Sequence, residues 1–197
     1  MLVVISYSLM AGIFKNLVNG KSVAIVGNLT PTTNLSNEID NHDIVIRINN
    51  FYNYDSNLVG KKVDMIFMTP TERWKNMSPQ ERHEHIIREQ QPIIFAVKHH
   101  KRLDYYTRIN HLCNCKIYKF DQDMLMNSQI YTTGTAALQI LSNCDNFTCD
   151  CYCFSFNDDW KSYINNYASH YKKYLSQEET KRTELFNILS KKSIINM

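Results

Sequence analysis

Short apolar runs rich in β-branched residues recur along the chain, and most are separated by polar segments of helical length. The runs lie at 23–26, 43–49, 63–68, 92–97, 116–120 and 148–156. Runs of this length that stop at glycine, proline or asparagine are typical of buried strands. The helices predicted between and after these strands lie at 79–90, 103–112, 135–141, 163–174 and 177–191.

Strands that alternate with helices are typical of βαβ units, in which the strands pair in parallel. The sequence therefore predicts an α/β fold with a single Rossmann-like domain, whose mostly parallel central sheet is flanked by helices. We see no linker and no internal repeat, so the domain is predicted to extend over 1–197, with 1–20 as an N-terminal segment of uncertain role. A chain of 197 residues can bury a core of this kind without disulfides.

Polar and turn-forming residues follow the first three of these strands. Gly27 and Asn28 come after the first strand, Asn49 ends the second, and Thr69 follows the third. A hydroxyl-rich turn at 132–134 opens a predicted helix. Ligands of parallel sheets bind outside the carboxyl ends of the strands. We therefore expect these residues to line one crevice.

The most apolar segment of the chain is its beginning, residues 1–14. It is too short to cross a bilayer, for which about 20 residues are needed. It has no basic region before the apolar run, so a signal peptide is weakly supported. We interpret the segment as a first helix or strand packed on the core, with a shortened membrane anchor as the alternative.

Charge and cysteine content narrow the class of protein further. Lys and Arg number 22 and Asp and Glu 19, and a net charge of +3 is too small and too evenly spread along the chain to indicate nucleic-acid binding. The six cysteines lack the C-x2-C spacing typical of zinc sites. Cys149, Cys151 and Cys153 alternate along the last predicted strand and are expected to share one face. We interpret the thiols as reduced, which predicts a cytoplasmic protein that is at most peripheral to a membrane.

Several common motifs are missing from the sequence. It has no G-x-G-x-x-G, G-x4-G-K-[ST] or G-x-S-x-G, so dinucleotide, P-loop and α/β-hydrolase sites are not predicted. Asp121 and Asp123 have the D-x-D spacing of a metal–nucleotide site, but we interpret them as a surface turn. Neutral amides and hydroxyls remain, with a helix N-terminus at Gly134 that suits a carboxylate or phosphate. The site is therefore expected to hold no metal.

Two stretches of the chain resemble the motifs of animal-type sialyltransferases. Residues 26–28 read V-G-N and residues 39–49 read I-D-N-H-D-I-V-I-R-I-N, which is similar to the family's large motif, V-G-N followed by I-D-x-H-D-x-V-x-R-x-N. Residues 131–134 read Y-T-T-G and residues 144–145 read C-D, which is similar to the small motif, P-[ST]-T-G with a helix and a C-D step after it. Bacterial sialyltransferases share the G-N, R-x-N and S-G elements.

The resemblance is close over 23–69 and 131–156, and it departs from the family in three ways. The cysteine that opens the family's large motif is replaced by Lys21 or Ser22, so the usual disulfide is not expected. The proline of the small motif is replaced by Tyr131. The chain is also short for a catalytic domain of this family, which implies that acceptor-binding insertions are missing.

The resemblance implies a variant glycosyltransferase-A fold and a role in glycan biosynthesis. The implied reaction is the metal-independent, inverting transfer of sialic acid, or of a related ulosonic acid such as Kdo, from its CMP donor to a hydroxyl of a glycan or glycolipid. No cofactor is implied beyond the CMP-sugar substrate. By resemblance, Asn28 and Asn49 hold the CMP. The carboxylate of the sugar lies at Thr132, Thr133 and Gly134, although Thr132 and Thr133 could instead be the N-cap of the helix.

His170 is the candidate general base of the implied reaction, because imidazole titrates near neutral pH. The family has an H-Y-Y type motif and a second histidine shortly before a glutamate, whereas this chain has His170-Tyr171 and, further on, Glu184. Either the two motifs have merged or the catalytic histidine is lost. Gly27, Tyr167, Tyr171 and Glu184 are expected to contact the donor phosphate or to support the site, and the tyrosines could equally pack in the core.

Arg47, inside the second strand, is expected to be structural. We predict that it pairs with Asp40 or Asp43 beneath the site.

Two alternatives to an active transferase stay open. The chain could be a catalytically inactive nucleotide-sugar-binding protein on the same fold, which is favoured if His170 faces away from Asn28 and Asn49. It could also be an unrelated Rossmann-like enzyme with a different phosphorylated ligand, which is favoured if Thr133 and Asn28 do not share a crevice.

Overall fold

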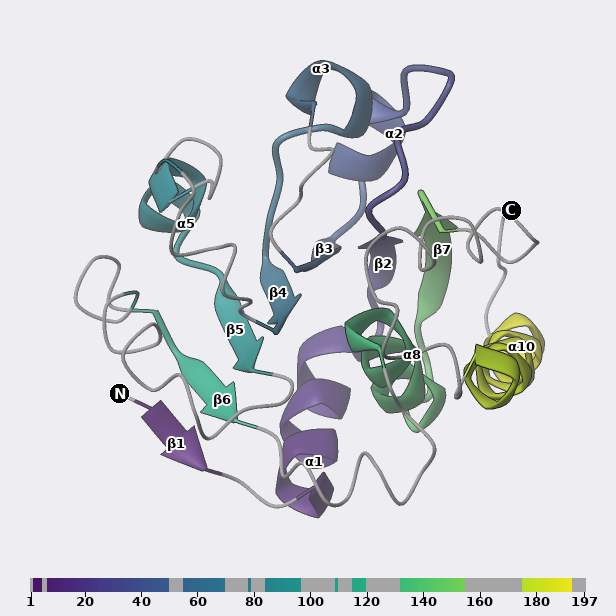
Figure 1. The fold of residues 1–197 in the computed structure, drawn as a ribbon. Coiled ribbons are helices and arrows are strands. Elements are labelled where there is room, and N and C mark those ends of the chain that lie inside the picture. Colours follow the sequence, from purple (N-terminus) through teal and green to yellow (C-terminus); the bar gives the residue numbers. More distant parts are fainter. Residues whose placement is uncertain are drawn as a thin grey trace.

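A parallel sheet forms the centre of the molecule (Figure 1). The computed structural model describes residues 2–4, 7–49, 55–69, 78, 84–96, 109, 115–119, 132–154 and 175–192. Within these residues the strands are β1 (Leu2–Val4), β2 (Ser22–Val26), β3 (Ile44–Ile48), β4 (Met65–Met68), β5 (Ile93–Ala96), β6 (Ile117–Lys119) and β7 (Thr148–Tyr152). They are ordered β1-β6-β5-β4-β3-β2-β7, and each pair of neighbours is parallel. The predicted α/β fold with a parallel central sheet is confirmed.

Helices connect these strands and cover both faces of the sheet. They are α1 (Tyr7–Val18), α2 (Ser36–Asp40), α3 (Ser56–Val59), α5 (Glu84–Gln90), α8 (Thr133–Ser142) and α10 (Leu175–Lys192). The apolar N-terminal segment supplies both a strand, β1, and the start of a helix, α1. Among the described residues, no helix is long and apolar enough to cross a membrane. The helices predicted at 103–112 and 163–174 lie outside the described residues, apart from Ile109.

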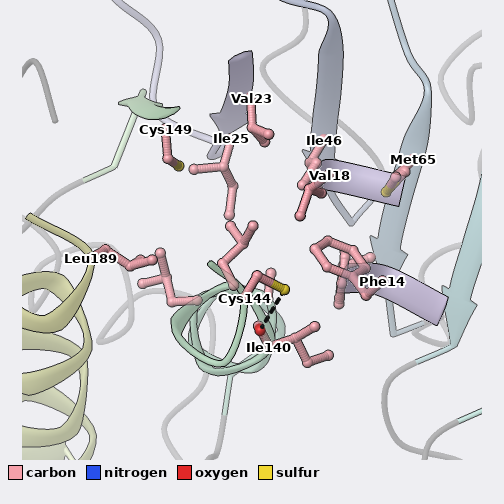
Figure 2. Packing of buried hydrophobic residues seen from close by; sticks show 14 of the residues in the cluster. Phe14, Val18, Val23, Ile25, Ile46, Met65, Ile140, Cys144, Cys149 and Leu189 are labelled. Atoms are coloured by element: carbon pink, nitrogen blue, oxygen red, sulfur yellow. Dashed lines mark hydrogen bonds between the residues drawn. The ribbon is translucent and has the colours of Figure 1, made fainter. Parts of the chain in front are cut away.

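Side chains of successive strand residues point to opposite faces, so each strand contributes to two cores. In β2, Val23 and Ile25 pack against α1, α8 and α10, whereas Ala24 and Val26 face α2 and α3. Figure 2 shows the first of these cores, in which Phe14 of α1 lies over the strands. All four of these β2 side chains are buried, which explains why the run at 23–26 is uniformly apolar rather than alternating.

The strand order identifies where a ligand would bind. From β2 the chain steps through β3, β4, β5 and β6 in one direction, and β7 then pairs with the opposite side of β2. The chain therefore leaves β2 toward β3, whereas the strand on the other side of β2 is reached only from β6. In parallel sheets a crevice is expected where the strand order changes direction in this way. The carboxyl ends of β2 and β7 flank this position.

The cysteines of β7 do not all share one face, which corrects the prediction from their alternation. Cys149 and Cys151 belong to the core beneath α8, but Cys153 packs against the opposite core. The reason is that β7 ends at Tyr152, and Cys153 has a left-handed backbone with φ of 58° that breaks the alternation. All the cysteines that the structure describes are free thiols.

Candidate functional site

The residues after β3 and β4 and at the start of α8 come together at the carboxyl edge of the sheet. The hydroxyl oxygens of Thr69 and Thr133 lie 2.9 Å apart, within hydrogen-bond distance. The backbone N–H of Thr69 donates to Oδ1 of Asn49 at 3.3 Å. These contacts join the two stretches that resemble the sialyltransferase motifs, since Asn49 ends the first and Thr133 lies in the second. Thr69, which we expected in the crevice without giving it a role, is the residue that connects them.

Asn49 has a left-handed backbone, with φ of 57°. Asparagine tolerates this conformation better than most residues, because its short polar side chain can bond locally. Its own N–H donates to the carbonyl of Phe67 at 2.6 Å, which continues the β3–β4 ladder by one residue. The turn therefore projects the Asn49 carboxamide at the strand end, where its oxygen fixes Thr69.

Gly27 lets the chain after β2 run against the end of β7. The N–H of Gly27 donates to the carbonyl of Tyr152 at 2.8 Å, and the N–H of Leu29 donates to the carbonyl of Cys153 at 3.1 Å. A Cβ atom at Gly27 would overlap the carbonyl oxygen of Cys153. Asn28 lies between these two bonds, and its Oδ1 is shielded from solvent. The backbone on both sides of the Asn28 carboxamide is thus fixed by β7.

Thr132 is the N-cap of α8, which was the alternative interpretation of this residue. Its backbone is extended, and its hydroxyl oxygen accepts a hydrogen bond from the N–H of Thr135 at 3.3 Å. Caps of this kind satisfy one of the first N–H groups of a helix, which have no acceptor within the helix. The N–H groups of Thr133 and Gly134 belong to the same turn. The cap therefore fixes a helix start whose positive end faces the strand ends.

Phe154 lies between the turn after β2 and the start of α8, a position that was not predicted from the sequence. Its ring is close enough to Gly27 and Gly134 that a Cβ atom at either glycine would lie 3.2 Å from a ring carbon. The aromatic ring thus separates the turn after β2 from the start of α8. Nothing in the sequence pattern indicates this contact, because the residues come from three separate elements.

Arg47 is structural, as predicted, and the structure identifies its partner. Its side chain is 1% exposed, and Nη2 lies 4.0 Å from Oδ1 of Asp40. Nη2 also donates to the carbonyl of Val59 at 2.8 Å, and Nε donates to the carbonyl of Lys62 at 3.0 Å. A buried guanidinium needs several acceptors of this kind. Asp43 is not the partner of Arg47.

The carboxylates of Asp40 and Asp43 bind two different segments, the turn before β4 and the start of β2. Asp40 accepts hydrogen bonds from the N–H groups of Lys61 and Lys62, and Gly60, with φ of 74°, allows the chain to approach it. Asp43 accepts from both the N–H and the hydroxyl of Ser22, at 2.8 and 3.0 Å. These hydrogen bonds from Ser22 hold the pKa of Asp43 below its ordinary value.

Of the remaining predicted residues, Glu184 lies on α10 and the others lie outside the described part of the chain. Glu184 is exposed on α10, and its Oε2 lies 3.3 Å from Nζ of Lys181 on the same helix. Such a pair at the surface contributes little to stability. The candidate base His170, the tyrosines Tyr167 and Tyr171, and the D-x-D pair lie outside the described residues.

Among the described residues at the carboxyl edge of the sheet, most side chains are neutral amides, hydroxyls and thiols. Burial raises the pKa of the Cys153 thiol to about 11, so it stays protonated at neutral pH and is a poor nucleophile there. In the described ranges no group of three or more His, Cys, Asp and Glu side chains is arranged to hold a metal ion. The arrangement is suited to binding a ligand through hydrogen bonds from amides, hydroxyls and a helix N-terminus.

Comparison of the chain with family models and with curated proteins finds no match. The resemblance to sialyltransferases therefore stays a prediction from residues 26–49 and 131–134, and the geometry of these residues is the further argument for it.

Proposed function

We propose that the chain is a metal-independent, inverting glycosyltransferase that moves sialic acid, or a related ulosonic acid such as Kdo, from CMP to a glycan hydroxyl. The observation that carries the proposal is the Thr69–Thr133 contact with Asn49 beside it. The two motif-like stretches are distant in sequence, yet their polar residues meet at the carboxyl edge of a parallel sheet, where ligands of such folds bind.

In this proposal the nucleotide lies along the ends of β2 and β3. The carboxamides of Asn28 and Asn49 offer neutral donors and acceptors to the cytosine and ribose of CMP. The Gly27 turn supports this role, because its contacts with β7 fix the backbone around Asn28. Since cytosine and ribose are neutral, their binding needs no counter-ion at these positions.

The acidic sugar lies at the start of α8. The positive end of the helix and the N–H groups of Thr133 and Gly134 favour a carboxylate at this place. Thr133 is 6% exposed and its hydroxyl contacts that of Thr69, so the hydroxyl is held in one position. Thr132 contributes indirectly in the proposal, because its oxygen caps the helix.

His170 is proposed as the general base. Its imidazole takes the proton of the acceptor hydroxyl while the oxygen bonds to the anomeric carbon of the sugar. The bond between that carbon and the phosphate oxygen breaks, and CMP leaves with the bonding electrons. The transition state resembles an oxocarbenium ion, as at other glycosyl centres.

Calorimetry with nucleotides tests the proposal. CMP is expected to bind more tightly than UMP, AMP or GMP. Asn49→Ala should weaken CMP binding by about 1–3 kcal/mol, the range for one or two lost hydrogen bonds. Asn143→Ala is the matched control, since Asn143 is exposed at the C-terminal end of α8, opposite the helix start at Thr133, and it should leave CMP binding unchanged. Equal binding of CMP and UMP would contradict the proposal.

A further inference from the structure

Tyr152, the last residue of β7, holds both ends of the segment that contains Asn28. Its backbone carbonyl accepts a hydrogen bond from the N–H of Gly27 at 2.8 Å. Its phenol hydroxyl donates to Oε1 of Glu38, in α2, at 3.0 Å. One residue of β7 thus contacts the beginning and the end of the segment 27–38, which we call the Asn28 loop.

Glu38 is fixed by a second residue as well. Its backbone carbonyl lies 3.0 Å from Nδ1 of His42, and Nε2 of His42 lies 2.8 Å from Oδ2 of Asp150. The His42 ring also packs edge-on against the Tyr152 ring, with centroids 5.7 Å apart. Asp150 and Tyr152 are two residues apart on β7 and point to the same face, so both reach the α2 side of the sheet.

The part of the loop between these anchors has no regular structure. Residues 29–35 form bends and irregular backbone between β2 and α2, and they belong to no strand of the sheet. Leu35 donates from its N–H to the carbonyl of Leu58 at 2.7 Å, near the α2 end. The N–H of Leu29 donates to the carbonyl of Cys153 beside Asn28, so the beginning of the loop is fixed at the end of β7, and the order of the remainder depends on its anchor at Glu38. A flexible loop has to be ordered when a ligand binds, and this cost lowers affinity.

We propose that Tyr152 and Glu38 form a clasp that holds the Asn28 loop in its ligand-binding conformation. Both are positioning residues, because they act through the loop and not by touching the ligand. The identity of the ligand as CMP rests on the proposed function, whereas the clasp itself does not. Burial and the Glu38 carboxylate raise the pKa of the Tyr152 phenol, so the hydroxyl remains a donor at neutral pH.

Amide hydrogen exchange of the ligand-free protein tests the clasp directly. Tyr152→Phe removes only the hydroxyl and keeps the ring and the carbonyl that binds Gly27. This variant should raise the rate of amide hydrogen exchange in residues 28–37 at least threefold, and Glu38→Ala should raise it equally. Glu38→Gln keeps an acceptor oxygen and should exchange like the parent chain. Tyr118→Phe is the matched control, because Tyr118 stacks on Phe95 in the sheet. Amide exchange of the Asn28 loop in this variant should equal that of the parent chain.

The double variant Tyr152→Phe/Glu38→Ala gives a second readout. If the two groups act only on each other, it should exchange no faster than either single variant. Loop exchange that is unchanged in Tyr152→Phe, or that rises by the full product of both changes in the double variant, would overturn the clasp.

CMP binding then tests whether the clasp positions Asn28. Tyr152→Phe should raise the Kd for CMP about three- to tenfold, the effect of one hydrogen bond of ordinary strength, and should change turnover at saturating donor less than twofold. A Kd equal to that of the parent chain, together with faster loop exchange, would overturn the positioning role. Failure of the parent chain to bind CMP would instead contradict the proposed function, and the exchange measurement would still decide whether the clasp exists.

Discussion

The side-chain hydroxyls of Thr69 and Thr133 lie 2.9 Å apart across a sequence separation of 64 residues. Thr69 follows β4 and Thr133 is the first residue of α8, so the contact ties a strand end to a helix start on the face of the sheet that α8 covers. Thr133 is buried, and a buried hydroxyl that loses its partner carries a desolvation cost. This pair connects the two stretches of the chain that carry the proposed ligand-binding residues.

Replacing either threonine by valine should therefore destabilise the protein. Valine has nearly the same shape but no hydroxyl, so Thr69→Val and Thr133→Val should each lower the free energy of unfolding by about 1 kcal/mol or slightly more. The double variant should lose less than the sum, because the two changes remove one shared interaction. Urea denaturation measures all three, and strictly additive losses would show that the hydroxyls do not stabilise each other.

The same two variants should differ in ligand binding. We expect Thr133→Val to weaken the binding of CMP-sialic acid about tenfold, because the sugar carboxylate loses the Thr133 hydroxyl as a partner. The binding of CMP, which has no such carboxylate, should not change. Thr69→Val is the comparison, and its effect on CMP-sialic acid should be smaller. Calorimetry with both ligands measures the difference, and an equal loss for CMP and CMP-sialic acid would place Thr133 at the nucleotide.

Two glycines should respond to alanine in opposite directions. Gly27→Ala should lower the free energy of unfolding by about 2 kcal/mol or more, because the new methyl group overlaps the rigid carbonyl of Cys153. Gly12 lies inside α1 with no atom close to a built Cβ, so Gly12→Ala should raise stability by about 0.5–1 kcal/mol. Thermal unfolding compares the two, and a neutral Gly27→Ala would show that the chain after β2 is not packed against β7 as described.

The stability of the protein should depend on Asp43 in a particular pH range. The pKa of Asp43 is lowered in the folded chain, first by the backbone N–H of Ser22 and then by its hydroxyl, from an ordinary value of 3.8. A group with a depressed folded pKa stabilises the protein above its unfolded pKa and loses this contribution as the pH falls through the folded pKa. The stability difference between the parent chain and Asp43→Asn should thus be full at neutral pH and shrink below about pH 4. A difference that stays constant down to pH 2 would contradict this.

The sequence predicted the main elements of the fold because the central strands β2 to β5 are short, largely apolar and buried runs. The runs at 23–26 and 43–49 correspond to Ser22–Val26 and Ile44–Ile48. The short helices α2 and α3 did not show in the pattern, since four or five residues give no helical period. The last strand ends earlier than predicted because the backbone of Cys153 turns left-handed, which no apolar pattern reveals.

The arrangement at the carboxyl edge of the sheet could be predicted only in part. Strand ends and helix starts are visible in a sequence, so Asn28, Asn49, Thr69 and Thr133 were expected near one another, and the structure shows the contacts among the last three. Tyr152 and Phe154 were missed because their roles depend on which strand is the neighbour of β2. That neighbour is β7, which lies over 100 residues further along the chain, and local patterns carry no information on such pairings.

The central claim is most directly tested by CMP release from CMP-sialic acid and CMP-Kdo, with a panel of glycan acceptors and with EDTA present. We predict release that depends on an acceptor and is insensitive to EDTA. In His170→Ala the release should fall by about 10²–10⁴, the loss typical of a missing general base, while the affinity for CMP stays unchanged. Release that requires Mn²⁺ or Mg²⁺, or CMP binding with no acceptor-dependent release by the parent chain, would contradict the account.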